Sequence, residues 1–345
     1  MAVQYWTGTV DGDFQNNGNW TEAASPVAGD EIVFDGRSVV DLDEGTLPSE
    51  TGNIAFDLIH VKSSYAGAIG TVGEPLAIGT AAGSEITVVF EGTGSMHLMC
   101  SLNTDNAASD AVIPRVICNS VGGTLYLYSL SNDGANTSTF TDVYLTHGTL
   151  ELDLELHTGI VGDGTGPVIT NLYIAPRNNK LKHATCTASI NSYKVNGPTY
   201  TNLYMQNGTF TTDSGLGTLH LRNGTLNLGT DAGAGTNVDI VTELIQTGGT
   251  LNWNPNEDAA YIAEGHIFGG SLNCSDTVNE TNSRVLGSGA NKNIYLYNGA
   301  SMDLQIAGSG LVTVAASSAL INLGGIITTD SLVSLGLTYS PDLGS

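Results

Sequence analysis

The stretch VDGDFQNNGNW at residues 10 to 20 places oxygen-bearing side chains at the spacing of a calcium-binding loop. Counted from Asp11, the candidate ligands are Asp11, Asp13, Asn17 and Glu22. Asn16 stands where such a loop needs glycine for its sharp turn, and no flanking amphipathic helix is indicated. Two interpretations therefore stay open: a structural calcium site, or turns in which Asp and Asn side chains accept hydrogen bonds from nearby backbone N–H groups. The second is favoured, and no other cofactor is indicated.

Other residues that could do chemistry are sparse. The chain has only 10 Lys and Arg. His220 and Arg222 are predicted to lie on the same face of one strand, and we interpret them as a surface pair. The one local basic cluster is Arg177, Lys180 and Lys182, which we interpret as a docking contact or a solvated loop. Motifs of serine hydrolases, zinc proteases and phosphate-binding loops do not occur in the sequence. We therefore predict that the chain is not an enzyme, although its 34 Asp and Glu leave a glycosidase pair open.

The composition predicts a chain made almost wholly of β-strands. Apolar residues make up 41% and charged residues only 13%, and 44 glycines accompany many Thr, Asn and Ser, which favours short strands joined by turns. The net charge of −24 repels phosphate backbones and anionic lipid, so neither nucleic acid nor a membrane is an expected partner. The four cysteines lack metal-ligand spacing and are predicted to be buried thiols.

A recurring unit predicts a parallel β-helix, that is, a β-solenoid. Each copy has a β-rich run, a turn with Gly or Asn, and a second alternating run, as in TNLYMQNGTFTT at 201–212. The turn positions are Gly67, Gly94, Gly123, Gly148, Asn179, Gly208, Gly224, Gly249, Gly270, Gly299 and Gly325. Their mean spacing of about 26 residues is too short for propeller blades, which need ~40 to 50. We therefore expect about 11 coils.

The alternation within strands predicts which side chains face the core. The predicted inward residues are Val143, Leu145, Leu150, Leu152, Leu203, Met205, Leu226, Leu228, Ile294 and Leu296. For the tyrosines of the first strand, core packing and an outward contact surface both stay open; these are Tyr126, Tyr128, Tyr144, Tyr173, Tyr204, Tyr295 and Tyr297. Variable spacing predicts projecting loops at 131–139, 157–168 and 229–239.

The N-terminal segment differs from the repeat and is rich in aromatic residues. Because solenoid ends need covering, we predict a cap or docking segment at 1–50, the β-helix at 51–334 and a tail or cap at 335–345. The stretch YWTGTVDGDFQNNGNWTEAASPVAGDEIVFDG, in which Trp6 and Trp20 flank a polar loop, resembles the N-terminal segment of bacterial and bacteriophage β-helical surface proteins. This resemblance covers about 32 residues and makes Trp6 and Trp20 candidate partner contacts.

The resemblance implies a structural virion protein, a bacteriophage capsid decoration or head-fibre-like β-helix that docks on the particle and stabilises it or presents a binding surface. The expected partners are the major capsid protein or another virion protein, further copies of the chain in a homotrimer, and a host surface glycan. The N-terminus lacks the pattern of a signal peptide, so we expect synthesis in the host cytoplasm and a place on the virion surface. The alternatives are a bacterial adhesin or passenger-like carbohydrate-binding β-helix and a tailspike-like polysaccharide depolymerase.

Overall fold

The chain forms two compact all-β units. The computed structural model describes residues 2–46, 54–79, 85–100, 111–129, 139–152, 168–174, 186–189, 199–212, 216–229, 241–253, 260–274, 284–288, 292–305 and 312–329. The N-terminal unit carries β1 to β10 and the C-terminal unit carries β11 to β22. In this described part, the only helix is the short 3-10 turn η1 (Asn17–Asn19). The predicted fold class, an all-β parallel solenoid, is confirmed.

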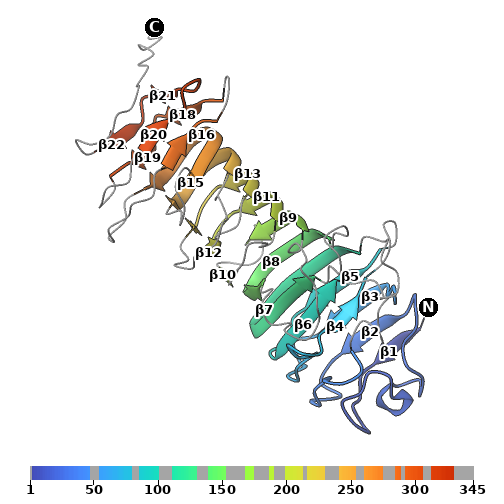
Figure 1. The fold of residues 1–345 in the computed structure, drawn as a ribbon. Coiled ribbons are helices and arrows are strands. Elements are labelled where there is room, and N and C mark those ends of the chain that lie inside the picture. Colours follow the sequence, from blue (N-terminus) through green and yellow to red (C-terminus); the bar gives the residue numbers. More distant parts are fainter. Residues whose placement is uncertain are drawn as a thin grey trace. The chain divides into compact units, whose positions relative to one another are not determined.

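The N-terminal unit consists of stacked parallel strands, which Figure 1 shows side by side from blue to green. They are β1 (Val3–Tyr5), β2 (Glu31–Phe34), β3 (Leu58–Val61), β4 (Leu76–Ile78), β5 (Thr87–Phe90), β6 (Ser95–Cys100), β7 (Val112–Ser129), β8 (Thr139–Glu151), β9 (Val168–Ile174) and β10 (Cys186–Ser189). The first ladder runs β1-β2-β3-β5-β7-β8-β9. The second ladder runs β4-β6-β7-β8-β10, so the long strands β7 and β8 belong to both.

The C-terminal unit repeats this plan. Its strands are β11 (Thr199–Met205), β12 (Thr209–Thr212), β13 (Leu216–Leu221), β14 (Thr225–Leu228), β15 (Val241–Trp253), β16 (Ala260–Asn273), β17 (Arg284–Leu286), β18 (Ile294–Tyr297), β19 (Ala300–Asp303), β20 (Val312–Val314), β21 (Leu320–Leu323) and β22 (Ile326–Thr328). The first ladder runs β11-β13-β15-β16-β18-β21 and the second β12-β14-β15-β16-β19-β22. A short third ladder joins β16, β17 and β20.

Alternate residues of the strands form the core. All ten side chains predicted to face inward are buried, among them Val143, Leu226 and Leu296. The residues between them are mostly half-buried or exposed, which is the period of two expected of a sheet with one covered face. Three cysteine side chains are described, and Cys100, Cys118 and Cys274 are all buried thiols, as predicted.

Glycine is required where the first ladder turns into the second. Gly249 and Gly270 have φ of 72° and 83°, a left-handed region that side chains disfavour. A Cβ on Gly270 would lie 2.3 Å from the carbonyl oxygen of Gly249, and one on Gly123 would lie 2.3 Å from that of Gly94. Each of these corners therefore rests on the corner of the preceding coil, with no room for a side chain between them.

The number of coils differs slightly from the predicted eleven. The described first ladder has seven strands in the N-terminal unit and six in the C-terminal unit. The turn count began at Gly67 and so left out β1 and β2, which pair in the same ladder although they lie in the predicted cap segment 1–50. The tail 335–345 and almost all of the predicted loops lie outside the described residues.

An aromatic cluster fills the N-terminal end of the core. Its buried members are Trp6, Phe14, Trp20, Phe34, Phe56 and Tyr65. The ring centroids of Trp6 and Trp20 lie 5.1 Å apart, and those of Phe14 and Trp20 lie 5.2 Å apart, both edge to face. Each indole N–H has an acceptor, since Trp20 donates to the carbonyl oxygen of Phe14 at 2.8 Å and Trp6 to that of Val40 at 3.0 Å. The cluster joins the N-terminal loops to the first ladder.

Candidate functional site

Asn19 is the centre of the loop that the sequence offers as a calcium site. Its side chain is buried, and its Nδ2 donates to Asp11 Oδ1 at 2.6 Å and to the carbonyl oxygen of Asp13 at 2.9 Å. Its Oδ1 accepts from the backbone N–H groups of Val10 at 2.9 Å and Asp11 at 3.2 Å. One buried amide therefore joins the two ends of the loop.

The oxygens proposed as calcium ligands are engaged by N–H groups. The pairs are Asp11 Oδ2 with Asn16 Nδ2, Asp13 Oδ1 with the Gln15 N–H, and Asn17 Oδ1 with the Ser25 N–H, each at 2.8 Å. The hydrogen bond from Asn19 is the main reason that the pKa of Asp11 lies below its usual value, with a smaller opposing effect of desolvation. Glu22 is exposed. This arrangement matches side-chain-capped turns.

No group of three or more His, Cys, Asp or Glu side chains that could hold a metal ion occurs in the described ranges. The structural calcium that the sequence left open as an alternative is not tested by this, and chelation can test it.

The sequence predicted two sets of partner contacts, the two tryptophans Trp6 and Trp20 and the basic cluster. Trp6 and Trp20 are 0% and 3% exposed, so both rings are packed inside the unit, and their role as partner contacts stays a prediction. Both rings pack against other members of the aromatic cluster, and they shape the surface through the loops that they hold. Arg177, Lys180 and Lys182 lie outside the described residues, and their docking role stays a prediction.

The first ladder of the N-terminal unit has an outer face with three columns of side chains. The central column is Tyr5, Val33, His60, Val89, Ile117, Tyr144 and Tyr173, in register from strand to strand. The first flank, two residues earlier on each strand, is Val3, Glu31, Leu58, Thr87, Arg115, Asp142 and Asn171. The second flank, two residues after the central column, is Asp35, Lys62, Glu91, Asn119 and Thr146, of which the last two lie within β7 and β8. A largely apolar column thus runs between two columns that carry charges.

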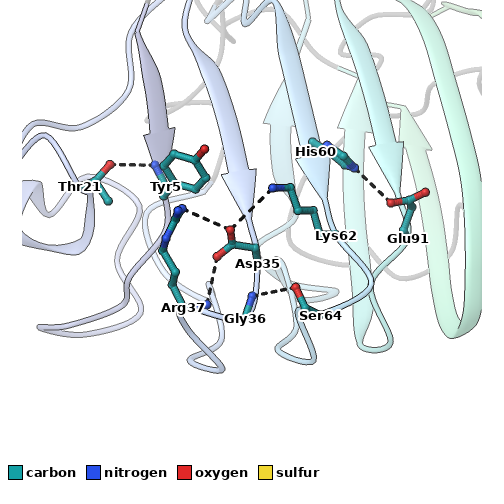
Figure 2. A network of polar contacts seen from close by, with 9 residues as sticks. All are labelled: Tyr5, Thr21, Asp35, Gly36, Arg37, His60, Lys62, Ser64 and Glu91. Atoms are coloured by element: carbon teal, nitrogen blue, oxygen red, sulfur yellow. Dashed lines mark hydrogen bonds and ion pairs between the residues drawn. The ribbon is translucent and has the colours of Figure 1, made fainter.

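Asp35 holds two cations at the start of the second flank. Its Oδ2 lies 3.3 Å from Arg37 Nη1 and 3.8 Å from Lys62 Nζ, and Figure 2 shows both side chains converging on it. The guanidinium carbon of Arg37 also lies 3.6 Å from the centroid of the Tyr5 ring, a cation–π contact. The Asp35 side chain is 13% exposed, whereas those of Arg37 and Lys62 are 50% and 40% exposed. The cations therefore form the outer surface here.

A polar chain continues along the second flank. His60 Nε2 lies 3.2 Å from Glu91 Oε2, as Figure 2 shows, and Asn119 Nδ2 donates to Glu91 Oε1 at 3.4 Å. The hydroxyl of Thr146 donates to Asn119 Oδ1 at 3.0 Å. These contacts orient the side chains across four strands and leave the Glu91 side chain 32% exposed. The face can therefore offer apolar and charged contacts of fixed position.

The C-terminal unit carries aromatic pairs on the outer face of its first ladder. The central column there is Tyr204, His220, Ile245, His266, Tyr295 and Ile321. The rings of Tyr204 and His220, and those of His266 and Tyr295, stack with centroids 4.7 Å apart in each pair. These tyrosines lie on the outer face and are half-buried. Because the ring faces meet each other, ring edges and hydroxyls are what this column offers to a ligand.

An asparagine ladder on the second ladder of the C-terminal unit escaped the sequence reasoning. Asn252 Nδ2 donates to Asn227 Oδ1 at 2.8 Å, and Asn273 Nδ2 donates to Asn252 Oδ1 at 3.1 Å. The signal was available, because each Asn stands two residues after a Thr or Ser that follows a corner glycine. The ladder fixes the amide side chains of three successive strands.

Comparison with protein-family models, with curated proteins and with solved structures found no match for this chain. In the ranges that the structure describes, there is no helix long and apolar enough to cross a membrane.

Proposed function

We propose that this chain is a structural protein of a bacteriophage particle, a capsid decoration or head-fibre-like solenoid that docks on the particle surface. The observation that carries the proposal is the N-terminal end of the solenoid, where the aromatic cluster and the Asn19 loop together form a self-contained end structure. In this role the protein works through its shape and its surface contacts.

The internal contacts at the N-terminal end of the solenoid support a role in docking rather than in catalysis. The loop oxygens, the two indole N–H groups and the aromatic rings are engaged with other groups of the same unit. Such internal satisfaction fixes the loops in one conformation, so a partner would bind them with little ordering cost. Exposed apolar side chains on these loops supply contact area, notably Val10 and Val39, which are 61% and 71% exposed.

The test is incorporation into particles assembled from the genome that encodes the chain. We expect its peptides in purified, salt-washed particles at a fixed ratio to the major capsid protein, measured by quantitative mass spectrometry. Val39→Asp should lower that ratio because it places a charge on the docking loops. Val121→Asp is the matched control, since Val121 is 79% exposed at a corner away from the cap. A chain that is abundant in the lysate and missing from washed particles would contradict the proposal.

A carbohydrate-binding surface protein is the second candidate, favoured by the outward aromatic pairs of the C-terminal unit. Tyr and His present both apolar area and hydrogen-bonding tips, which suits sugar rings. A glycan array with the full chain would test it, and Tyr295→Ala should then remove any binding while Tyr144→Ala in the other unit should not. Release of reducing sugar from host capsule would instead indicate the depolymerase alternative.

A further inference from the structure

The outer face of the N-terminal unit carries a charge pattern that is complementary to itself. We propose that a second copy of this chain binds this face, related to the first by a two-fold axis that passes between β3 and β5 and runs parallel to the strands. This inference goes beyond the proposed function and does not depend on it. The occupant is identified by the order of charges along the two flanks.

The symmetry fixes which strands meet. Rotation about this axis reverses the order of the strands and keeps each column opposite the same column of the other copy. The strand β3 then lies opposite β5 of the second copy, β2 opposite β7, and β1 opposite β8. Since parallel strands are evenly spaced by ~4.8 Å in both copies, the match holds along the whole face.

Opposite charges meet on both flanks in this arrangement. On the first flank, Glu31 of β2 lies opposite Arg115 of the second copy, and Arg115 lies opposite its Glu31. On the second flank, Lys62 and Glu91 pair in the same reciprocal way. The interface therefore contains four contacts between opposite charges, which steer association and fix its register.

The central column contributes apolar side chains, chiefly from β5, β7 and β8. Ile117 lies opposite β2 of the second copy, where Val33 is only 5% exposed, and Tyr144 lies opposite β1, where Arg37 packs on the ring of Tyr5. The ring of His60 faces Val89 next to the axis. The apolar centre with a charged rim is the usual anatomy of a protein interface.

Neighbouring registers are penalised by like charges. An axis through β3 would set Asp35 opposite Glu91, and an axis through β5 would set Glu31 opposite Asp142. A parallel packing, as in the homotrimer expected from the sequence, would place Glu31 beside Asp35 of the neighbouring copy. The axis between β3 and β5 is the one of these arrangements that sets unlike charges together on both flanks.

The area predicts a reversible dimer. Six strands span about 24 Å and the three columns about 14 Å, so with side chains the face covers roughly 600 Å² per copy. A standard interface buries ~800 Å² per partner. The net charge of −24 on each copy adds long-range repulsion. The dimer should therefore appear as concentration rises at ~0.15 M salt, where the screening length is ~8 Å.

The test is sedimentation equilibrium of the full chain over a range of concentrations. We expect a monomer–dimer equilibrium, weakened at least about tenfold by either Glu31→Arg or Arg115→Glu, because each sets like charges together twice. An equimolar mixture of these two variants should regain the wild-type dimer, since the mixed pair places unlike charges at both contacts. Glu243→Arg, on the same flank of the C-terminal unit, is the control with an equal change of charge and should have no effect.

Circular dichroism first checks that each variant is folded. If one of them is not, Lys62→Glu and Glu91→Lys give the same mixing test on the other flank. A wild-type chain that stays monomeric to high concentration or forms a trimer would overturn the proposal. So would single variants that associate as well as the wild type, or a mixture that stays as weak as its components.

Discussion

The two units build the same ladder with different regularity. In the N-terminal unit, paired residues of successive first-ladder strands lie 27 to 29 positions apart in the sequence. In the C-terminal unit the separation ranges from 16 to 29. Strand register is nevertheless maintained in both. The difference shows that alternation and corners set the register, whereas the loops between strands set the length of a coil.

The units also differ in what stabilises their ends and faces. Both units have stacked corner glycines, but the N-terminal unit adds an aromatic cluster and charged flanks, whereas the C-terminal unit adds an asparagine ladder. We therefore expect matched substitutions in the two units to have unequal effects on stability.

The largest effect is expected at the corners. Gly270 and Gly29 both have φ of 83°, but a Cβ on Gly270 would lie 2.3 Å from the Gly249 carbonyl oxygen, whereas no atom of the described residues lies within 4 Å of one on Gly29. Gly270→Ala should lower the free energy of unfolding by roughly 3 kcal/mol or more. Gly29→Ala should lower it by roughly 1 kcal/mol, which is the effect of the backbone conformation alone. Urea unfolding measures both. Equal costs would show that the contact between corners is unimportant.

The next effect compares two buried tryptophans. Trp20 Nε1 donates to the Phe14 carbonyl oxygen at 2.8 Å, whereas Trp253 Nε1 is buried and has no hydrogen-bond partner among the described residues. Trp20→Phe should therefore lower the free energy of unfolding by roughly 2 kcal/mol, because it leaves a buried carbonyl unpaired. Trp253→Phe should lower it by roughly 1 kcal/mol, because the loss of packing is partly offset by removal of an unpaired donor. Thermal unfolding of the two variants gives the comparison. A greater loss at Trp253 would contradict this account.

Alkaline pH should affect both units in the same direction. Burial raises the pKa of Cys100 in one unit and of Cys274 in the other from 9.0 to about 12. The unfolded thiols ionise first, so the stability that they contribute is present below about pH 9 and is lost as pH rises towards 12. At pH 10 the loss should be about 1 kcal/mol per thiol.

Unfolding by urea at pH 8 and pH 10 measures this loss. Cys100→Ala should reduce the pH dependence of the N-terminal unit alone, and Cys274→Ala that of the C-terminal unit. A pH dependence unchanged by both substitutions would rule out the thiols as its source.

The smallest effect is expected from a chelator. Because the carboxylate of Asp11 already accepts hydrogen bonds from Asn16 and Asn19, removing calcium should leave the unfolding temperature of the N-terminal unit unchanged. Asp11→Ala should lower it, since Asn19 then loses an acceptor. A fall of several degrees with chelator, reversed by added calcium, would restore the metal interpretation.

The sequence predicted the core well because the core obeys a local rule. Alternation within a strand of four to seven residues decides which of Leu226 and Asn227 faces inward, and a corner glycine follows from its turn. The outer columns could not be derived in this way, since Glu31 and Leu58 become neighbours only through pairing across 27 residues.

The N-terminal segment was the least predictable part. Its strands β1 and β2 are followed by long polar loops rather than by a corner glycine, so the repeat count missed them. The burial of Trp6 and Trp20 was also missed, because an aromatic residue beside a polar loop has the same sequence pattern as an exposed contact residue. A buried ring differs from an exposed contact residue in its tertiary contacts, here the carbonyl oxygens of Val40 and Phe14 that accept the indole N–H groups.

The coils of the N-terminal unit have nearly equal lengths. Each coil takes 27 to 29 residues and adds one strand to the first ladder. Duplication or deletion of one such segment in the gene would move whatever lies beyond it by about 4.8 Å and leave the remaining contacts intact. A lineage of such proteins could therefore change its reach in whole steps, without having to evolve a new core for each length.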